Sequence, residues 1–365
     1  MQENCSMNHF LNDLERIRNN GHEIVLYGYA KLAKRLLRFL ELYSINVSLI
    51  TVDQEYIEST AVQGAYRVVT IDECMESGNA YNYIVGFNSR GNAEAIIKKL
   101  KDSSKSILLY DFGYGTCEDI HNAIAFYDSL STCYSNFVDE IYSWLEDEIS
   151  VVTLRDFIKQ KQTGTFGLYG RHFTENQYFP DDVITMKKGE TFVDCGAYTG
   201  DTVTAFLDKL KRDNVPGYRA IYALEPTPAA FERLAAMSRS LDNCFCFQKG
   251  VWDQEETLPF NVSGRESIIH DSGSGTIDLV PLDSLCDNVP VSFIKMDVEG
   301  AELKALRGAV NVIKKNRPTL AICIYHKPED IITIPRFIKS LHPDYKLYVR
   351  GHSRLVTNEF VLYAV

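Results

Sequence analysis

The chain has 365 residues, of which 45% are apolar and 24% are charged, and its formal net charge is −11. This length exceeds a single core of usual size, so we expect two domains of an ordinary globular protein. The acidic balance disfavours a nucleic-acid partner or an anionic membrane surface, and no apolar run is long enough to span a membrane. The nine cysteines form no C-x-x-C pair and the N-terminus has no signal-peptide pattern, so we predict reduced thiols in a cytoplasmic protein.

The first part of the chain predicts a small Rossmann-like α/β domain over residues 1–115. We expect strands at 23–27, 47–52, 83–87 and 107–110, with helices at 9–19, 31–43 and 92–101. Asp53 follows the second strand, as in a nucleotide-binding half-sheet. The turn after the first strand keeps only Gly28 of the dinucleotide fingerprint, so a structural or partner-binding domain is the alternative to nucleotide binding.

Residues 116–162 are rich in helix formers and aromatic side chains, and they predict a connector of two or three helices. Heptads are not sustained, which argues against a coiled coil. The aromatic side chains fit core packing, or else a contact between domains or between the two chains of a homodimer.

Residues 163–365 predict a larger domain in which strands and helices alternate. We expect strands at 192–195, 220–224, 244–248, 292–296, 319–325, 345–349 and 360–365, and helices at 201–212, 228–239, 301–314 and 329–339. A polar insert, 253–287, has strand character at 257–262 and 276–280. The last two strands predict an antiparallel pair, so the expected fold is a doubly wound, mostly parallel α/β sheet of seven strands.

The segment from Thr191 to Asp201 predicts a strand, a tight turn and the start of a helix. Gly196 and Gly200 allow a sharp turn with room for a ligand, and the helix start offers N–H groups to an anion. Asp194 would repel a diphosphate and favours a ligand with a cationic amine. S-adenosylmethionine has this amine together with a carboxylate, a ribose and an adenine; the alternative is an α/β turn without a ligand.

Residues at the next strand ends complete the predicted cofactor site. Glu225 suits the two ribose hydroxyls, and Gly250 permits close approach of a ligand. Val251 or Trp252 would cover an adenine face, although core packing explains Trp252 equally well. The predicted cofactor-binding residues are Asp194, Cys195, Gly196, Ala197, Tyr198, Gly200, Asp201, Thr202, Glu225, Pro226, Gly250, Val251 and Trp252.

Three residues that could carry proton chemistry follow the fourth and fifth strands. Asp297 and Glu299 end the fourth strand, and His326 ends the fifth, so all three are expected at one edge of the sheet. Two acids and a histidine in one cleft can divide the tasks of orienting a hydroxyl and taking its proton. The same residues could ligate a divalent metal, but paired carboxylates without a metal are commoner, so we predict no metal.

Four stretches carry a family resemblance. They are 192–202, 293–302 with 306–309, 317–318 with 325–330, and the lead-in 178–180. Together they resemble the FkbM family of S-adenosylmethionine-dependent methyltransferases, over roughly residues 178–365. The resemblance implies a class I methyltransferase fold and O-methylation of a sugar, glycan or other small-molecule hydroxyl. It also implies that Asp194, Gly196, Ala197, Gly200 and Glu225 hold the cofactor, and it leaves open which of Asp297, Glu299 and His326 is the base.

Two other functions remain as alternatives. One is a nicotinamide-dependent sugar-modifying oxidoreductase that works through the first domain, although the complete glycine fingerprint is absent. The other is a non-catalytic nucleoside-binding protein, which would show cofactor affinity without transfer.

Overall fold

We analysed a computed structural model that describes residues 8–60, 66–87, 93–112, 119–263, 266–269 and 275–365. The chain forms two compact units. Unit 1 comprises Met1–Ser135, Arg155–Arg171 and Arg354–Thr357, and unit 2 comprises Asn136–Leu154, His172–Ser353 and Asn358–Val365. These units are defined by contacts and do not test the predicted domain boundaries at 115 and 162, which stay a prediction.

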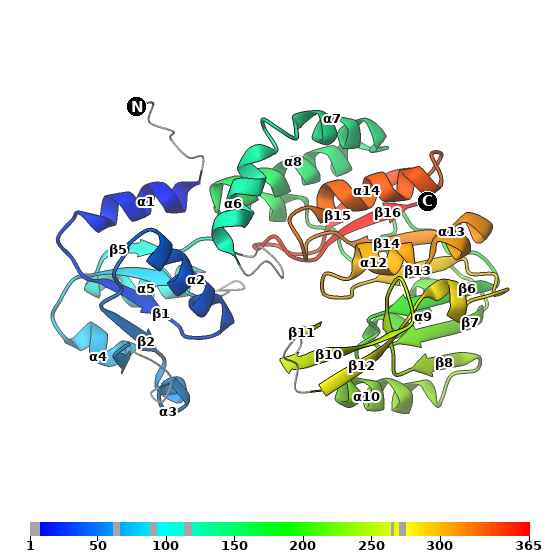
Figure 1. Ribbon diagram of the computed structural model, residues 1–365, viewed down its shortest axis with the longest axis horizontal. Coiled ribbons are helices and arrows are strands. Elements are labelled where there is room, and N and C mark those ends of the chain that lie inside the picture. The colour runs from blue at the N-terminus through cyan, green and yellow to red at the C-terminus, as the bar shows by residue number, and fades with distance from the viewer. Residues whose placement is uncertain (1–7, 61–65, 88–92, 113–118, 264–265, 270–274) are drawn as a thin grey trace. The chain divides into compact units, whose positions relative to one another are not determined.

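Unit 1 contains a five-stranded parallel sheet in the order β3-β2-β1-β4-β5 (Figure 1). The strands are β1 (Ile24–Tyr27), β2 (Leu49–Val52), β3 (Val68–Thr70), β4 (Tyr81–Val85) and β5 (Ser104–Leu108). The helices are α1 (His9–Arg18), α2 (Lys31–Leu42), η1 (Gln54–Tyr56), α3 (Ile57–Thr60), α4 (Ile71–Glu76), α5 (Ala93–Leu100), η2 (Lys101–Ser103) and α6 (Ile120–Ser129). The Rossmann-like α/β character predicted for this region agrees with this sheet.

Besides α6, three further helical segments lie in sequence between the two large sheets. They are α7 (Ser135–Trp144), α8 (Glu148–Thr163) and η3 (Tyr169–His172). The unit boundary at Leu154 divides α8. The predicted connector of two or three helices therefore corresponds to α6, α7 and α8.

Unit 2 contains a seven-stranded sheet in the order β15-β16-β14-β13-β6-β7-β8 (Figure 1). The strands are β6 (Glu190–Cys195), β7 (Tyr218–Leu224), β8 (Cys244–Phe247), β13 (Phe293–Met296), β14 (Thr319–Cys323), β15 (Leu347–Gly351) and β16 (Phe360–Ala364). All neighbours are parallel except that β16 runs antiparallel to both β14 and β15. The mostly parallel sheet and its final antiparallel pair are confirmed.

The helices of unit 2 connect these strands. They are α9 (Asp201–Arg212), α10 (Pro228–Ser238), α11 (Leu282–Leu285), α12 (Glu302–Arg307), α13 (Val310–Asn316) and α14 (Asp330–Leu341). The predicted single helix over 301–314 is wrong, because α12 ends at Arg307 with Gly308 as its C-cap, and α13 begins at Val310. A Cβ on Gly308 would lie 1.9 Å from the Trp252 carbonyl oxygen, so this break brings two backbones into contact.

The polar insert and the short strand before it form a small separate sheet in the order β11-β10-β12-β9. Its strands are β9 (Gly250–Val251), β10 (Glu256–Ser263), β11 (Glu266–Ile269) and β12 (Gly275–Val280). The two strands predicted in the insert correspond to β10 and β12. Of the insert, residues 264–265 and 270–274 lie outside the described residues.

One face of the large sheet carries an aromatic core. Side chains alternate along a strand, so Phe192 and Phe293 lie on the same face of their strands as Asp194 and Lys295. Phe192 stacks on Phe206 of α9 with ring centroids 4.6 Å apart. The core side chains therefore lead directly to two charged residues at the carboxyl edge of this face.

No helix in the part of the chain that the structure describes is both long and apolar enough to cross a membrane.

Candidate functional site

The glycine turn after β6 has a backbone that requires glycine. Three of its residues have positive φ: Gly196 (+78°), Tyr198 (+46°) and Gly200 (+92°). A Cβ on Gly196 would lie 1.9 Å from the carbonyl oxygen of Asp297. The turn after β6 is therefore in backbone contact with the end of β13, which carries the predicted catalytic acids.

The backbone amides of this turn are divided between two tasks. The amides of Gly196 and Ala197 donate to the Leu224 carbonyl at 3.0 and 2.9 Å, so they fasten the turn to the end of β7. The donors available to an anion are instead the first amides of α9, which have no intrahelical acceptors. Asp201 opens α9 and Thr202 is buried beside it.

Glu225 joins the end of β7 to the glycine turn. One of its carboxylate oxygens accepts the Tyr198 amide at 3.0 Å and the other accepts the Thr227 amide at 2.8 Å. The residue is 6% exposed. Each carboxylate oxygen can accept further hydrogen bonds, so these contacts orient Glu225 without using up its acceptor capacity.

Asp194 lies beside a cationic side chain of the protein. It is fully buried, and its Oδ1 lies 3.1 Å from the ammonium of Lys295. Neither carboxylate oxygen has a hydrogen bond of good geometry. Burial raises the pKa of Asp194 to about 6, although the charge of Lys295 opposes this rise. The immediate cation next to Asp194 is a protein side chain, and its role toward a ligand stays a prediction.

The remaining predicted cofactor residues lie around this turn and the start of the insert. Cys195 and Ala197 are buried, and Tyr198 is 36% exposed. A Cβ on Gly250 would approach Leu279 to 2.6 Å and Pro226 to 3.9 Å, so β9 lies near the end of β7. Val251 is buried, while the Trp252 ring packs on the insert and lies 5.0 Å from the Lys304 ammonium.

The three predicted catalytic residues come together. Nε2 of His326 lies 3.5 Å from an oxygen of Asp297 and 3.6 Å from an oxygen of Glu299. Asp297 and Glu299 have side chains 26% and 31% exposed, whereas His326 is 3% exposed. The two acids thus reach the surface of the edge, and the histidine lies behind them. Glu299 has a φ of +53°, a strained value for a glutamate that points to a functional constraint.

His326 is held by a third acid that was not predicted as a site residue. Its Nδ1 lies 2.8 Å from the buried carboxylate of Glu302, which also accepts the Val298 amide at 3.0 Å. Burial by itself would lower the pKa of His326, but Glu302, Asp297 and Glu299 raise it to about 10. With acceptors at both ring nitrogens, the geometry suits an imidazolium that donates from both.

The pKa of Asp297 is shifted in the opposite direction from that of His326. Burial opposes its ionisation, but Lys295, His326 and a hydrogen bond from Tyr178 together lower its pKa. Asp330, a buried acid beside this cluster, has a pKa raised to about 8 by burial and by the charge of Glu302. The site therefore contains an ionised acid at its surface and a second acid behind it that binds a proton more readily.

Oxygens of Asp297 and Glu302 and a ring nitrogen of His326 also lie within 4.8 Å of one another, which is close enough to hold a metal ion. The short Glu302–His326 hydrogen bond satisfies two of these groups without a metal. The prediction of no metal stays a prediction, and a chelator tests it.

Sequence reasoning missed Lys295, Tyr178 and Glu302. Lys295 had a signal, because it is the one charged residue in the strand 293–296. Its Nζ donates to the Gly196 carbonyl at 2.7 Å, and it lies 5.1 Å from the centroid of the Tyr178 ring. The contact between Tyr178 and Asp297 spans 119 positions, and no local pattern could have predicted it.

Unit 1 provides a second strand-end acid with a different environment. Asp53 follows β2, and both of its oxygens accept the Tyr27 hydroxyl at 2.9 Å. The Lys99 ammonium lies 2.7 Å from one of them. The carboxylate that would hold a ribose in a nucleotide-binding half-sheet is therefore paired within the protein.

A shallow groove of about 600 Å³ lies over α7, α12 and α14 in unit 2. Its lining includes Trp144, Arg307, Arg336 and Phe337. Its lining contains none of the predicted site residues, which lie at the strand ends.

Comparison with known proteins agrees with this geometry. Residues 194–349 match the model of the methyltransferase FkbM domain. The chain contains an FkbM methyltransferase domain. The matched range of this FkbM domain includes all the predicted catalytic and cofactor-binding residues and also Lys295 and Glu302, whereas Tyr178 precedes it.

Solved structures place the FkbM domain in a known fold. The chain is similar to methyltransferase FkbM from Methylobacillus flagellatus KT, with a TM-score of 0.73 and 19% identity, over 98% of this chain and 95% of that chain. A fibrillarin of Aeropyrum pernix in complex with S-adenosyl-L-methionine has a TM-score of 0.31 and 16% identity, over 50% of this chain and 69% of that chain. A putative methyltransferase of Streptococcus mutans, SMU.1697c, in complex with SAH has a TM-score of 0.30 and 11% identity, over 49% of this chain and 90% of that chain. No curated protein matches the chain in sequence.

Proposed function

We propose that the FkbM domain binds S-adenosylmethionine over the carboxyl ends of β6 and β7 and transfers its methyl group to a hydroxyl of a sugar, glycan or related small molecule. The observation that carries this proposal is the contact between Gly196 and the Asp297 backbone, which puts the predicted cofactor turn directly beside the predicted catalytic acids. The sheet order supports it as well. Counted from β6 as the first strand of the domain, the order is 3-2-1-4-5-7-6, which we interpret as the class I methyltransferase arrangement.

The protein's part in such a transfer is alignment, exclusion of water and removal of one proton. When bound, S-adenosylmethionine would supply a methyl group that its positive sulfur already activates. Glu225 would hold the ribose hydroxyls, and the first turn of α9 would meet the carboxylate. Positioning of this kind is worth about 7–11 kcal/mol of the barrier in well-oriented reactions.

The acceptor hydroxyl must lose its proton as its oxygen bonds to the methyl carbon and the bond between that carbon and sulfur breaks. An imidazolium cannot accept this proton, and the contacts of His326 hold it in that form. We therefore propose that Asp297 or Glu299 takes the proton while His326 holds both acids in place. General-base help of this kind is worth about 10²–10⁴-fold.

The test is transfer from labelled methyl donor to a panel of sugars, sugar nucleotides and glycans, with and without EDTA. We expect labelled product from the wild-type protein that resists the chelator. Cofactor affinity without transfer to any acceptor would favour the non-catalytic alternative, and EDTA-sensitive transfer would contradict the metal-free site. The variant His326→Gln tests the role of the histidine. If this variant keeps its affinity for S-adenosylhomocysteine but its methyl transfer no longer depends on Asp297 and Glu299, the histidine only positions the two acids.

The nicotinamide-dependent alternative has less support. It needs a free acid after β2, and Asp53 is paired with Lys99 and Tyr27. We propose instead that unit 1 is a structural or partner-binding domain and that the chain works in the cytoplasm, without a nucleic-acid partner. The seven cysteines of the described part are all free thiols, which fits a reducing compartment. The mass of the protein in solution would test the predicted homodimer.

A further inference from the structure

Tyr178 has a strained backbone within the hydrophobic core of unit 2. Its φ is +69°, and bulky aromatic residues rarely adopt positive values. The residue is 7% exposed, so the surrounding structure holds it in this conformation. Strain of this kind persists only where neighbouring contacts over-determine it, and it is a reason to ask what the side chain does.

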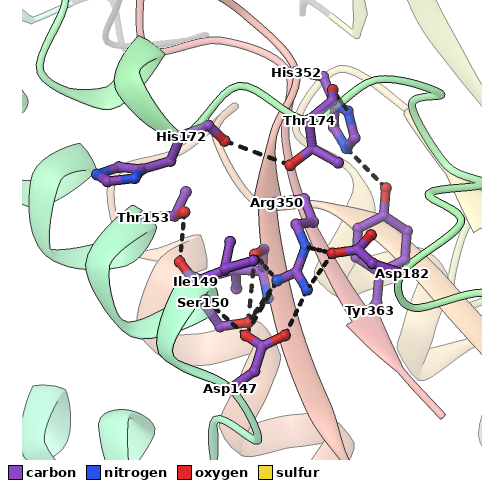
Figure 2. Close-up of polar contacts among 11 residues, drawn as sticks. Asp147, Ile149, Ser150, Thr153, His172, Thr174, Asp182, Arg350, His352 and Tyr363 are labelled. Carbon is purple, nitrogen blue, oxygen red and sulfur yellow. Dashed lines mark hydrogen bonds and ion pairs between the residues drawn. The ribbon is translucent and has the colours of Figure 1, made fainter.

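A chain of hydrogen bonds holds the Tyr178 backbone. Its amide donates to the hydroxyl of Tyr363 at 3.0 Å, and this hydroxyl lies 2.9 Å from Nε2 of His352. Nδ1 of His352 lies 2.7 Å from the Thr174 carbonyl. Figure 2 shows the pairing of His352 and Tyr363, beside the cluster in which the buried Arg350 contacts Asp147 and Asp182.

The donors and acceptors in this chain have a single consistent assignment. The Thr174 carbonyl can only accept, so Nδ1 of His352 must donate to it. Burial lowers the pKa of His352 to about 4, so the ring is neutral and its Nε2 accepts the Tyr363 proton. The Tyr363 oxygen then remains as the acceptor for the Tyr178 amide. Every donor and acceptor in this chain of hydrogen bonds therefore has a partner. These bonds hold the Tyr178 backbone in place and so fix the direction in which its side chain points.

The side chain of Tyr178 ends at the predicted catalytic acids. Its hydroxyl donates to one Asp297 oxygen at 2.7 Å, while the other Asp297 oxygen faces His326. Its ring lies over the Lys295 ammonium at 5.1 Å from the centroid. Lys295 in turn binds the Gly196 carbonyl. Tyr178 therefore contacts the acid directly and the cofactor turn through one lysine.

We propose that Tyr178 is a positioning residue that fixes one oxygen of Asp297 and leaves the other to face His326 and the acceptor. The reaction in this statement rests on the proposed methyl transfer, but the hydrogen bond and its effect on Asp297 do not. Burial and nearby acids keep the phenol of Tyr178 protonated by raising its pKa, so it acts as a donor throughout the working pH range. A carboxylate held in this way stays ionised and cannot rotate away from the cleft.

The experiment compares Tyr178→Phe with Tyr345→Phe in the full chain. Both changes remove one buried tyrosine hydroxyl from unit 2, and the Tyr345 hydroxyl donates to the Pro318 carbonyl away from the site. Aspartate labelled with ¹³C at the carboxyl carbon allows Asp297 to be titrated by NMR, with Asp297→Asn assigning its signal. A parallel calorimetric titration with S-adenosylhomocysteine measures the cofactor site.

We expect the Asp297 midpoint to rise by about one pH unit in Tyr178→Phe, because a hydrogen bond to the ionised form is lost. Tyr345→Phe should keep the wild-type midpoint, and both variants should bind S-adenosylhomocysteine within about threefold of wild type. An unchanged Asp297 midpoint in Tyr178→Phe, or an equal rise in Tyr345→Phe, would overturn the proposal. Absence of S-adenosylhomocysteine binding by the wild type would instead count against the proposed function and leave the Asp297 result standing.

Discussion

The two large sheets of this chain begin in the same way and then use their strand ends differently. In unit 1, β1 is followed by Gly28 with positive φ and then by α2, a helix of twelve residues. In unit 2, β6 is followed by Gly196 with positive φ and then by α9, also a helix of twelve residues. In unit 1 the acid after the second strand is bonded to Tyr27 and Lys99 at the surface. In unit 2 the acids at the ends of β6 and β13 lie against the buried Lys295 and the buried His326.

The strand-end ion pairs of the two sheets differ in how deeply they are buried. The Lys99–Asp53 pair is 36% and 40% exposed, whereas the Lys295–Asp194 pair is 2% and 0% exposed. A buried pair costs much more to desolvate than an exposed pair, and removing one partner leaves an uncompensated buried charge. Substitutions at matched residues of the two units test this difference in burial.

The largest effect is expected for the two lysines. Lys295→Met leaves Asp194 buried without a counter-charge, so we expect it to lower the free energy of unfolding by about 3–5 kcal/mol. Lys99→Met removes a half-exposed pair and should cost less than about 1 kcal/mol. Urea unfolding followed by circular dichroism measures both. The double variant Lys295→Met with Asp194→Asn should recover part of the loss, and equal losses for the two single variants would refute the distinction.

Local patterns in the sequence predicted most of the fold of unit 2. The apolar runs and the helix start at Asp201 predicted each of the seven strands of the large sheet and the whole of α9. The strand β3 was missed because it has only three residues, and the break at Gly308 was missed because its cause, the Trp252 carbonyl, lies far away in the sequence. Strand ends are local features, which is why Asp297, Glu299 and His326 could be predicted together.

The contacts that organise the site could not be predicted in the same way. The position of Lys295 in an apolar strand is visible in the sequence, but its partners Asp194, Gly196 and Tyr178 depend on which strands become neighbours. Asp194 was expected to meet a ligand, and only the parallel pairing of β6 with β13 reveals that it meets Lys295. The sequence thus predicted which residues lie at the carboxyl edge of the sheet, but not which buried side chains contact them.

The next effect compares the two turn glycines. A Cβ on Gly196 would collide with the Asp297 backbone at 1.9 Å, whereas a Cβ on Gly28 would meet the ring of Phe87 at 2.9 Å. Both have positive φ, so alanine costs at least about 1 kcal/mol at each position. We expect Gly196→Ala to cost more than about 2 kcal/mol and to reduce affinity for S-adenosylhomocysteine, because a side chain can yield and a backbone cannot. Urea unfolding and calorimetry would show the difference; equal costs with unchanged affinity would speak against a close turn.

A smaller effect is expected from pH. The pKa of His326 is raised from 6.5 to about 10, so its stabilising contribution is complete below about pH 6.5 and is lost as the pH rises toward 10. Since one unit of pKa corresponds to 1.36 kcal/mol, wild type should lose more than about 1 kcal/mol over this window relative to His326→Gln. The pKa of His352 is lowered to about 4, so its contribution is lost as the pH falls below 6.5. Unfolding curves of His326→Gln and His352→Gln that show the same pH dependence would contradict this assignment.

We propose that the nucleoside of S-adenosylmethionine binds at the carboxyl edge of the seven-stranded sheet and not in unit 1. Calorimetric titration of wild type, Glu225→Gln and Asp53→Asn with S-adenosylhomocysteine distinguishes these two locations. We predict one site per chain, an affinity about tenfold weaker or worse in Glu225→Gln because a charged hydrogen-bond acceptor is lost, and wild-type affinity in Asp53→Asn. Binding that Glu225→Gln leaves intact and Asp53→Asn abolishes, or no binding by the wild type, would contradict the account.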